Sequence, residues 1–129
     1  MNTANVTTAR AAYRSNAVAT ASPARLLVML VERLVLDIER GHSAQLSGSW
    51  EDAHRNLLHA QDIVVELESS LRVDQMPGGR ELASVYEYLR NRLVLANVRR
   101  QPSVTAEALL LARQICDTWR EAAMAAAVS

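Results

Sequence analysis

Apolar residues recur at steps of three and four along four stretches of the chain, the spacing of one face of an α-helix. The first stretch covers residues 23–40, the second 50–71 and the fourth 104–123, while the third follows the turn at 76–79 and ends before Pro102. The stripes include Leu27, Leu30, Leu34 and Ile38; Leu57, Val64 and Leu67; Leu82, Tyr86, Leu89 and Leu93; and Ala108, Leu111, Ile115 and Trp119. The pattern therefore predicts four helices.

Capping and turn residues separate these stretches. Ser22-Pro23 is typical of a helix start, because a serine hydroxyl accepts from a free amide N–H and proline fits the first helical position. We expect Gly41 to end the first helix and residues 42–49 to form the loop after it. Ser49 is expected to cap the second helix, and Pro102-Ser103 closes the third helix and caps the fourth.

Helices of about 18 to 22 residues with short connections pack most economically as an antiparallel bundle with up-down-up-down topology. We therefore predict an all-α fold, an antiparallel up-down-up-down four-helix bundle, in which residues 22–129 form the bundle domain. The first residues of the chain are small, polar and aperiodic. We expect residues 1–21 to form a partly disordered N-terminal arm.

The composition of the 129-residue chain supports one globular domain and limits the classes of partner that it can bind. Its 14 basic residues, all arginine, balance 14 acidic residues, and the two signs are interspersed. This balance argues against nucleic acid and against a membrane surface as partners. The longest apolar run, Leu26 to Val31, is too short to cross a bilayer and follows no apolar stretch. We expect neither a transmembrane helix nor a secretory signal, and we predict a cytoplasmic protein.

Histidine and cysteine residues carry no strong signature of catalysis. Glu51 and His54 have the spacing of a metal-binding pair in ferritin-like bundles, but such centres need a second pair and two further carboxylates. We therefore predict no metal and no other cofactor. Cys116, the single cysteine, forms no disulfide framework and has no nearby histidine to activate it.

A histidine phosphotransfer bundle with His54 as the phosphate acceptor is an alternative from another functional class. That family has Lys and Gly shortly after the histidine, whereas this chain continues Arg55-Asn56-Leu57-Leu58. Without a cation and a small residue beside the imidazole, a phosphoryl group is poorly stabilised and its approach is crowded. We therefore predict that the protein is not an enzyme.

Each predicted helix also carries two apolar residues, seven positions apart, that point well away from its stripe. The pairs are Met29 and Leu36, Leu58 and Val65, Tyr88 and Leu95, and Leu109 and Cys116. Single exposed apolar residues are ordinary, but adjoining pairs would make shallow grooves that suit an amphipathic helix of another chain. A homodimer face and insignificant scatter are the other two interpretations.

Three stretches of the chain resemble a known family. The first runs from Ala12 to Pro23 with the letters AYRSNAVATASP, followed by Leu26-Leu27 and Met29-Leu30. The others are Val85-Tyr86-Glu87-Tyr88-Leu89, with Arg92-Leu93 and Ala96-Asn97 after it, and Asp117-Thr118-Trp119-Arg120-Glu121-Ala122. Together they resemble the flagellin-specific export chaperones of the FliS family. The chain departs at Val31-Glu32-Arg33, where the family often has Tyr-Asp-Gly, and it has Arg where the family's surfaces are rich in Lys.

The resemblance implies a cytoplasmic chaperone that binds the C-terminal segment of flagellin and prevents premature polymerisation. It further implies delivery of flagellin to the flagellar type III export apparatus. Members are antiparallel helical bundles that use no cofactor, and the client wraps along the outside of the bundle, partly as helices. A generic dimeric helical adaptor remains a further alternative.

The resemblance and the outward-facing apolar residues together select the residues expected to bind the partner. They are Tyr13 and Val18 in the arm, and Leu26, Met29, Leu36, Leu58, Val65, Tyr88, Leu95 and Leu109 on the helices. The arm is expected to occupy one groove of the empty chaperone and to leave when the client binds. Trp50 and Trp119 continue the stripes of their helices, so we expect them to close the ends of the bundle and not to touch the client.

Overall fold

Four α-helices make up most of the part of the chain that the computed structural model describes, residues 22–128. They are α2 (Pro23–Leu46), α3 (Trp50–Ser70), α4 (Gly79–Val98) and α5 (Pro102–Val128), with a short 3-10 helix, η1 (Val73–Gln75), between α3 and α4. These residues contain no strand, and the predicted all-α four-helix fold is confirmed. None of these four helices is both long enough and apolar enough to cross a lipid bilayer. The predicted arm lies outside the described residues.

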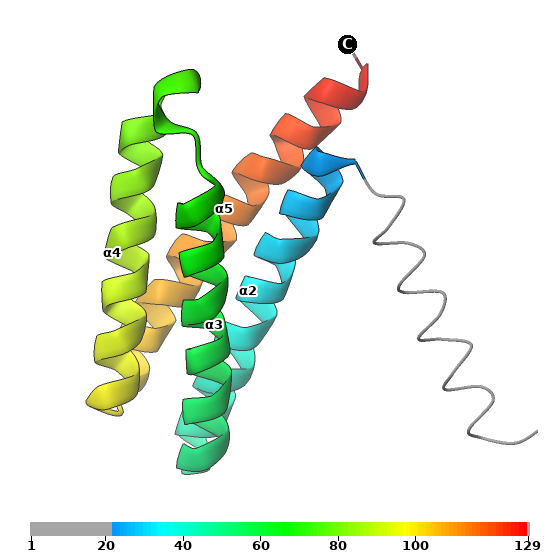
Figure 1. The fold of residues 1–129 in the computed structure, drawn as a ribbon. Helices are drawn as coiled ribbons and strands as arrows, with labels where there is room; N and C mark the ends of the chain where they lie inside the picture. Colours follow the sequence, from blue (N-terminus) through cyan, green and yellow to red (C-terminus); the bar gives the residue numbers. More distant parts are fainter. Residues whose placement is uncertain (1–21, 129) are drawn as a thin grey trace, which may run out of the picture.

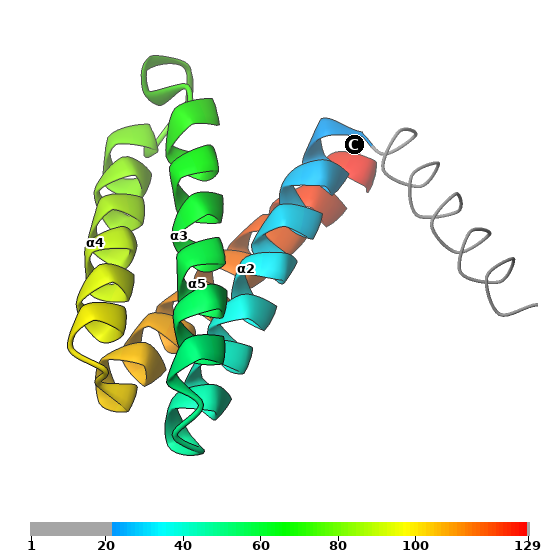
Figure 2. The same ribbon diagram turned by 60° about the horizontal axis from the view of Figure 1, so that its bottom comes forward.

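The helices alternate in direction, and each packs against two others (Figure 1). α3 lies between α2 and α4, and α5 closes the ring by packing against both α4 and α2. α5 runs obliquely: it starts beside the end of α4 and ends beside the start of α2, as a second view also shows (Figure 2). This oblique course decides where the bundle opens.

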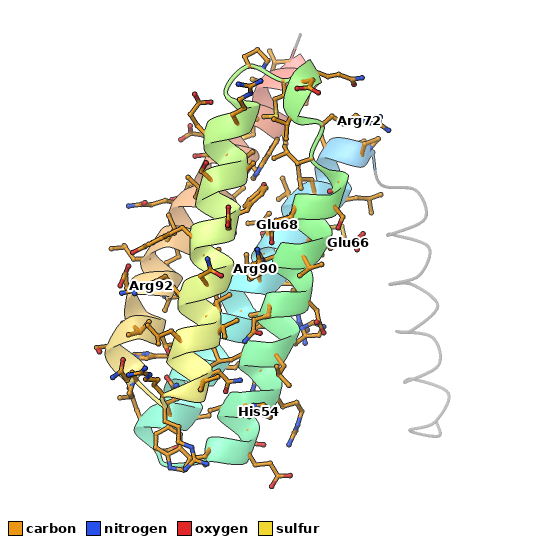
Figure 3. The ribbon with its side chains drawn as sticks, turned by 60° about the vertical axis from the view of Figure 1, so that its left-hand side comes forward. His54, Glu66, Glu68, Arg72, Arg90 and Arg92 are labelled. Carbon is orange, nitrogen blue, oxygen red and sulfur yellow. The ribbon has the colours of Figure 1, made fainter. Side chains whose placement is uncertain are left out.

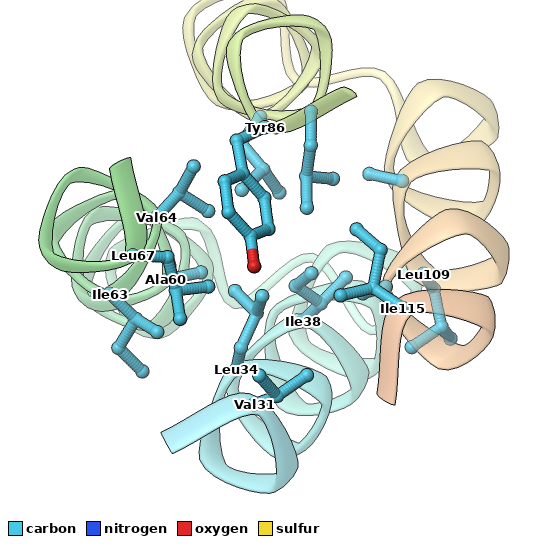
Figure 4. Packing of buried hydrophobic residues seen from close by; sticks show 14 of the residues in the cluster. Val31, Leu34, Ile38, Ala60, Ile63, Val64, Leu67, Tyr86, Leu109 and Ile115 are labelled. Carbon is cyan, nitrogen blue, oxygen red and sulfur yellow. The ribbon is translucent and has the colours of Figure 1, made fainter. Parts of the chain in front are cut away.

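Buried apolar side chains from all four helices meet along the middle of the bundle (Figure 4). They include Val31, Leu34 and Ile38 of α2; Leu57, Val64 and Leu67 of α3; Tyr86, Leu89 and Leu93 of α4; and Ala108, Ala112 and Ile115 of α5. Tyr86 is the largest of the fully buried side chains, and its ring points between the helices (Figure 4). The stripes predicted from the three- and four-residue spacing therefore form the core.

The first helix does not end at Gly41, as the sequence predicted, but continues to Leu46. Gly41 is buried, and a Cβ atom at this position would lie 2.9 Å from Cδ2 of Leu57 on α3. The missing side chain therefore lets α2 and α3 approach closely. The prediction was wrong because a glycine at a helix contact and a glycine that ends a helix look alike in a sequence.

The glycine that ends α2 is Gly48, whose φ of +76° is in the left-handed region. Its N–H donates to the carbonyl of Gln45 at 3.1 Å, and the N–H of Ser49 donates to the carbonyl of Ala44 at 2.8 Å. These two hydrogen bonds are the Schellman motif that satisfies the last carbonyls of a helix. The loop between α2 and α3 is thus confined to residues 47–49.

The predicted caps are confirmed at one helix and corrected at another. Oγ of Ser22 accepts from the N–H of Arg25 at 3.2 Å, and Pro23 is the first residue of α2. Ser49 makes no capping hydrogen bond through its side chain. Its N–H already completes the end of α2, and this fixes its backbone in the turn.

The last helix is longer than predicted. α5 begins at Pro102 and continues past the predicted end near Ala123 through a run of alanines, which favour helix.

A buried hydrogen-bonded chain joins three helices where α2 stops and α5 starts. Oγ1 of Thr105 donates to Oε1 of Gln45 at 2.6 Å, and Nε2 of Gln45 donates to the carbonyl of Ala96 at 3.1 Å. Leaving one such buried group unpaired costs about 1–3 kcal/mol. The chain of hydrogen bonds therefore fixes how α2, α4 and α5 meet at this end.

Candidate functional site

An open apolar groove of about 320 Å³ lies between α4 and α5 and is called the α4/α5 groove below. Leu82 and Val85 of α4 form one wall, and the other wall comes from α5. The lining is completed by Met76, Leu111, Gln114, Ile115, Thr118, Trp119 and Ala122. It contains no charged side chain, so it suits the apolar face of a segment from another chain.

One helical turn before Leu111, a polar cluster ties the start of α5 to α4. The carboxylate of Glu107 accepts from the hydroxyl of Tyr88 at 2.5 Å and from Nη2 of Arg92 at 2.7 Å. The Arg92 guanidinium also lies over the Tyr88 ring, 5.7 Å from its centroid. These hydrogen bonds lower the pKa of the Glu107 carboxyl, and the one to Glu107 raises the pKa of the Tyr88 phenol. The first turns of α5 are thus held against α4.

Farther along, α5 is tied to α2. Arg113 pairs with Glu39 at 3.1 Å, and Arg120 pairs with Glu32 at 2.9 Å. Such exposed ion pairs contribute little to stability, but they show that this part of α5 lies beside α2. Between Leu111 and Trp119, the oblique course of α5 leaves the α4/α5 groove open beside α4.

The side of the bundle between α3 and α4 is closed by comparison. Nε of Arg90 on α4 donates to Oε1 of Glu68 on α3 at 2.6 Å, and both residues lie between the two helices (Figure 3). Arg92 lies on the side of α4 nearer to α5 (Figure 3). The Arg90–Glu68 pair thus closes this part of the contact between α3 and α4, whereas α4 and α5 leave the groove between them.

Trp119 separates the α4/α5 groove from a second apolar groove. This second groove of about 270 Å³, called the α2/α3 groove below, is lined by Leu27, Leu67, Ser70, Leu71, Arg72, Gln75, Met76, Tyr86 and Trp119. The indole Nε1 of Trp119 donates to the hydroxyl of Tyr86 at 3.0 Å. Burial raises the pKa of the Tyr86 phenol, so this hydroxyl stays protonated at neutral pH.

Trp50 and Trp119, both expected to close the ends of the bundle, lie in different surroundings. Trp119 packs against the core, as expected, but its partly exposed ring also lines both grooves, so it is not confined to closing the bundle. Trp50 lies at the opposite end, where the Arg100 guanidinium is 5.1 Å from its ring centroid. This cation–π contact covers the start of α3.

One of the four outward-facing pairs belongs to the core. Leu109 and Cys116 are 8% and 2% exposed and are members of the buried apolar cluster. The prediction that this pair faces outward was wrong, because α5 passes from one neighbour to another and buries a wider arc than one stripe. Leu109 is therefore a core residue and not an exposed contact for a client.

The other predicted residues lie on the surface to different degrees. Leu26, Leu58, Val65 and Tyr88 are exposed, whereas Met29, Leu36 and Leu95 are partly buried. None of the seven lines the α4/α5 groove or the α2/α3 groove. The two grooves are thus built from other residues, and the role of these seven stays a prediction. Tyr13 and Val18 lie outside the described residues.

Sequence reasoning missed the residues that line the α4/α5 groove. Leu82, Leu111, Ile115 and Trp119 follow the helical spacing of core positions, and Val85 entered only as part of the family-like stretch. The spacing gives the direction in which a side chain points, but it does not give the distance to the next helix. Where α5 leaves α4, residues with a core pattern face an open groove.

His54, considered above as a metal ligand or a phosphate acceptor, contacts a side chain of another helix. His54 is exposed, and its Nδ1 lies 2.9 Å from Nδ2 of Asn97 on α4. Within residues 22–128, no group of three His, Cys, Asp or Glu side chains is placed to hold a metal ion.

Cys116 is expected to resist thiol reagents in the folded protein. It is buried, and this burial raises the pKa of its thiol, so little thiolate is present even at mildly alkaline pH. With Ellman's reagent at pH 8, we expect no reaction until guanidinium unfolds the chain, after which the one cysteine reacts fully. Rapid reaction of the native protein would contradict the packing of α5.

Known proteins similar to this chain share one description. A family model described as Flagellar protein FliS matches residues 5–126. The chain is 30% identical over 111 residues to the Flagellar secretion chaperone FliS of Bacillus subtilis (strain 168), covering 86% of this chain and 83% of that protein. It is 26% identical over 102 residues to the Flagellar secretion chaperone FliS of Vibrio cholerae serotype O1 (strain ATCC 39315 / El Tor Inaba N16961), covering 77% and 74%. The family match includes both walls of the α4/α5 groove.

Proposed function

Because the chain belongs to the FliS family of flagellar secretion chaperones, we propose that it binds the C-terminal segment of flagellin in the cytoplasm. It thereby prevents premature polymerisation and assists delivery to the flagellar type III export apparatus. Membership of a family of secretion chaperones favours client binding over the phosphotransfer alternative for His54.

The α4/α5 groove is the observation that carries this proposal. Its lining is apolar and partly exposed, so a client helix that lays its apolar face between Val85 and Leu111 removes further apolar area from water. Complete burial of one aliphatic side chain stabilises by about 1.5–3 kcal/mol. A few partial burials offset the several kcal/mol that ordering a flexible segment costs. The resulting moderate affinity suits a client that is released at the export apparatus.

Further contacts extend the proposed binding surface beyond the groove. Leu58 and Val65 on α3 and Tyr88 on α4 are 41%, 49% and 49% exposed and are available to a client that wraps around the bundle. Leu26 on α2 is exposed as well, and Met29, Leu36 and Leu95 are partly buried. We assign these seven residues to secondary contacts, because none of them lines the groove.

The proposal is tested by mixing the protein with the flagellin encoded in the same genome. We expect a stoichiometric complex on size-exclusion chromatography with full-length flagellin and none with flagellin that lacks its C-terminal segment. Light scattering on the same column gives the oligomeric state of the free protein and so tests the homodimer alternative. No complex with the cognate full-length flagellin, or equal binding of the truncated one, would overturn the proposal.

Replacing Tyr13 with alanine tests the proposed competition between the N-terminal segment and the client. If Tyr13 and Val18 anchor this segment over the binding surface, the apparent affinity is reduced by the fraction of chaperone that is covered. We expect the Tyr13→Ala variant to bind flagellin more tightly by isothermal titration calorimetry. An unchanged dissociation constant counts against the competition.

A further inference from the structure

We propose that a pocket where α3 begins and α4 ends binds a small carboxylate, held by Arg100 and His54. The pocket has a volume of about 240 Å³, is called the Arg100 pocket below, and is lined by Trp50, His54, Asn97 and Arg100 among others. None of the described residues that line it is acidic. It shares no residue with the α4/α5 groove or the α2/α3 groove, so the inference goes beyond the proposed function.

The backbone of Arg100 has a conformation that favours glycine. Its φ is +49°, and within residues 22–128 no other residue except glycine has a positive φ. Its N–H donates to the carbonyl of Asn97 at 3.3 Å, and the N–H of Gln101 donates to the carbonyl of Ala96 at 3.1 Å. These hydrogen bonds end α4, and glycine would make them without the strain that a side chain brings. The turn alone therefore does not explain an arginine at this position, and strained residues are common at functional sites.

The turn places the guanidinium of Arg100 over the ring of Trp50. The two groups are 5.1 Å apart, measured from the guanidinium carbon to the ring centroid. Arg100 is exposed and has no ion-pair partner among residues 22–128. Stacking uses the face of the guanidinium and leaves its N–H groups, which lie in the plane, free to donate. These N–H groups form the fork that binds a carboxylate through two hydrogen bonds.

His54 offers a second donor to the same pocket. It lies on α3 near this end of the bundle (Figure 3), and its Nδ1 is 2.9 Å from Nδ2 of Asn97. An amide N–H that donates to Nδ1 places the proton of the neutral imidazole on Nε2. This Nε2 has no hydrogen-bond partner in the described part of the chain. Arg100 and His54 thus bring donors from two sides of the pocket toward one anionic group.

The lining of the Arg100 pocket also limits what carries the anionic group. Trp50, Ala53 and Val98 give the pocket an apolar wall beside its two donors. This combination fits a carboxylate on a short apolar stem better than inorganic phosphate, which has no stem to cover the wall. Such a group is offered by a free organic acid or by an acidic side chain of a bound protein.

An NMR titration of the full chain tests the site and separates the two sources. The probes are butyrate, glutamate capped at both ends as it occurs within a protein, and capped glutamine as the uncharged control. The readouts are the indole N–H of Trp50 and the backbone N–H of Arg100, at constant pH and ionic strength. We expect saturable shift changes with butyrate, with capped glutamate or with both, and none with capped glutamine.

The pattern of binding decides between the sources. Saturation by butyrate alone identifies a free organic acid, saturation by capped glutamate alone identifies an acidic side chain, and saturation by both supports the shared carboxylate chemistry. No saturable change with either acid, or an equal change with capped glutamine, overturns the inference. Because the grooves take no part in this titration, such a result leaves the proposed function intact.

The variants Arg100→Gly and Arg99→Gly separate binding from the stability of the turn. Arg99 is also exposed, but its backbone is right-handed and it does not line the pocket. We expect Arg100→Gly to weaken binding of the acid at least about tenfold and Arg99→Gly to weaken it less than about twofold. Because glycine relieves the left-handed strain only at position 100, we expect Arg100→Gly to melt no lower than Arg99→Gly. Equal weakening by both variants, or a much lower melting temperature for Arg100→Gly, would show that Arg100 serves the turn and not a ligand.

Discussion

Replacing Leu111 with aspartate is expected to weaken binding of the flagellin C-terminal segment by at least about 100-fold, or 2.7 kcal/mol. Leu111 lines the α4/α5 groove and is partly buried in the free protein. In the free variant, water reaches the new carboxylate through the open groove. In the complex, the apolar face of the client would remove that water and leave the charge unpaired, which costs several kcal/mol. Isothermal titration calorimetry measures the loss directly.

The neighbouring residue provides a matched control for this prediction. Leu110 is 60% exposed and does not line the groove, so the Leu110→Asp variant has the same composition and is expected to bind as the wild type does. Val85→Asp places the charge on the opposite wall and is expected to repeat the loss. Thermal unfolding followed by circular dichroism confirms that each variant is folded. Normal binding by folded Leu111→Asp and Val85→Asp proteins would exclude this groove as the client site.

Replacing Gly79 with alanine is expected to lower the free energy of unfolding by about 1–3 kcal/mol, the usual cost of an overpacked site. Gly79 is the first residue of α4 and is buried, and a Cβ atom there would lie 2.5 Å from the carbonyl oxygen of Val73. Because the obstacle is backbone, the 3-10 turn or the start of α4 has to move. The N–H of Gly79 also bonds the carbonyl of Met76, so we expect weaker client binding as well.

Gly41→Ala is the contrasting variant for this test. Its Cβ atom would meet the buried Leu57 side chain and not backbone, so one side chain has to shift, and alanine favours the helix interior by about 1 kcal/mol over glycine. Urea unfolding of both variants should show the greater loss for Gly79→Ala. A neutral Gly79→Ala variant, or a larger loss for Gly41→Ala, would show that the segment before α4 is not packed as described.

The fold was predictable from the sequence because local signals and packing agree. Leu34, Leu57, Leu89 and Ile115 follow the helical spacing, and each is buried where the spacing places it. The end of the first helix was not predictable, because Gly41 is explained only by a contact with Leu57 on another helix. A glycine in a sequence does not reveal whether it ends a helix or lets a second helix pack closely against the first.

The sequence predicted the type of site, an apolar surface for another chain, but not which residues form it. Surplus apolar residues and the resemblance of three stretches pointed to a surface for an amphipathic segment. The groove is set instead by the course of α5, whose Glu107 binds α4 while Arg113 and Arg120 bind α2. Residues with a core pattern, such as Leu111, are left uncovered along this course, whereas Leu109 is buried. Helix crossing depends on all four helices together and leaves no local signal.

Methyl NMR of the chaperone with and without the flagellin C-terminal segment tests the central claim most directly. In a sample labelled at leucine, valine, isoleucine and methionine methyl groups, we expect the largest shift changes at Leu82, Val85, Leu111, Ile115 and Met76, which line the α4/α5 groove. Smaller changes are expected at Leu58 and Val65, which face outward from α3. Binding that leaves the groove methyl groups unchanged and shifts only residues elsewhere would contradict the account.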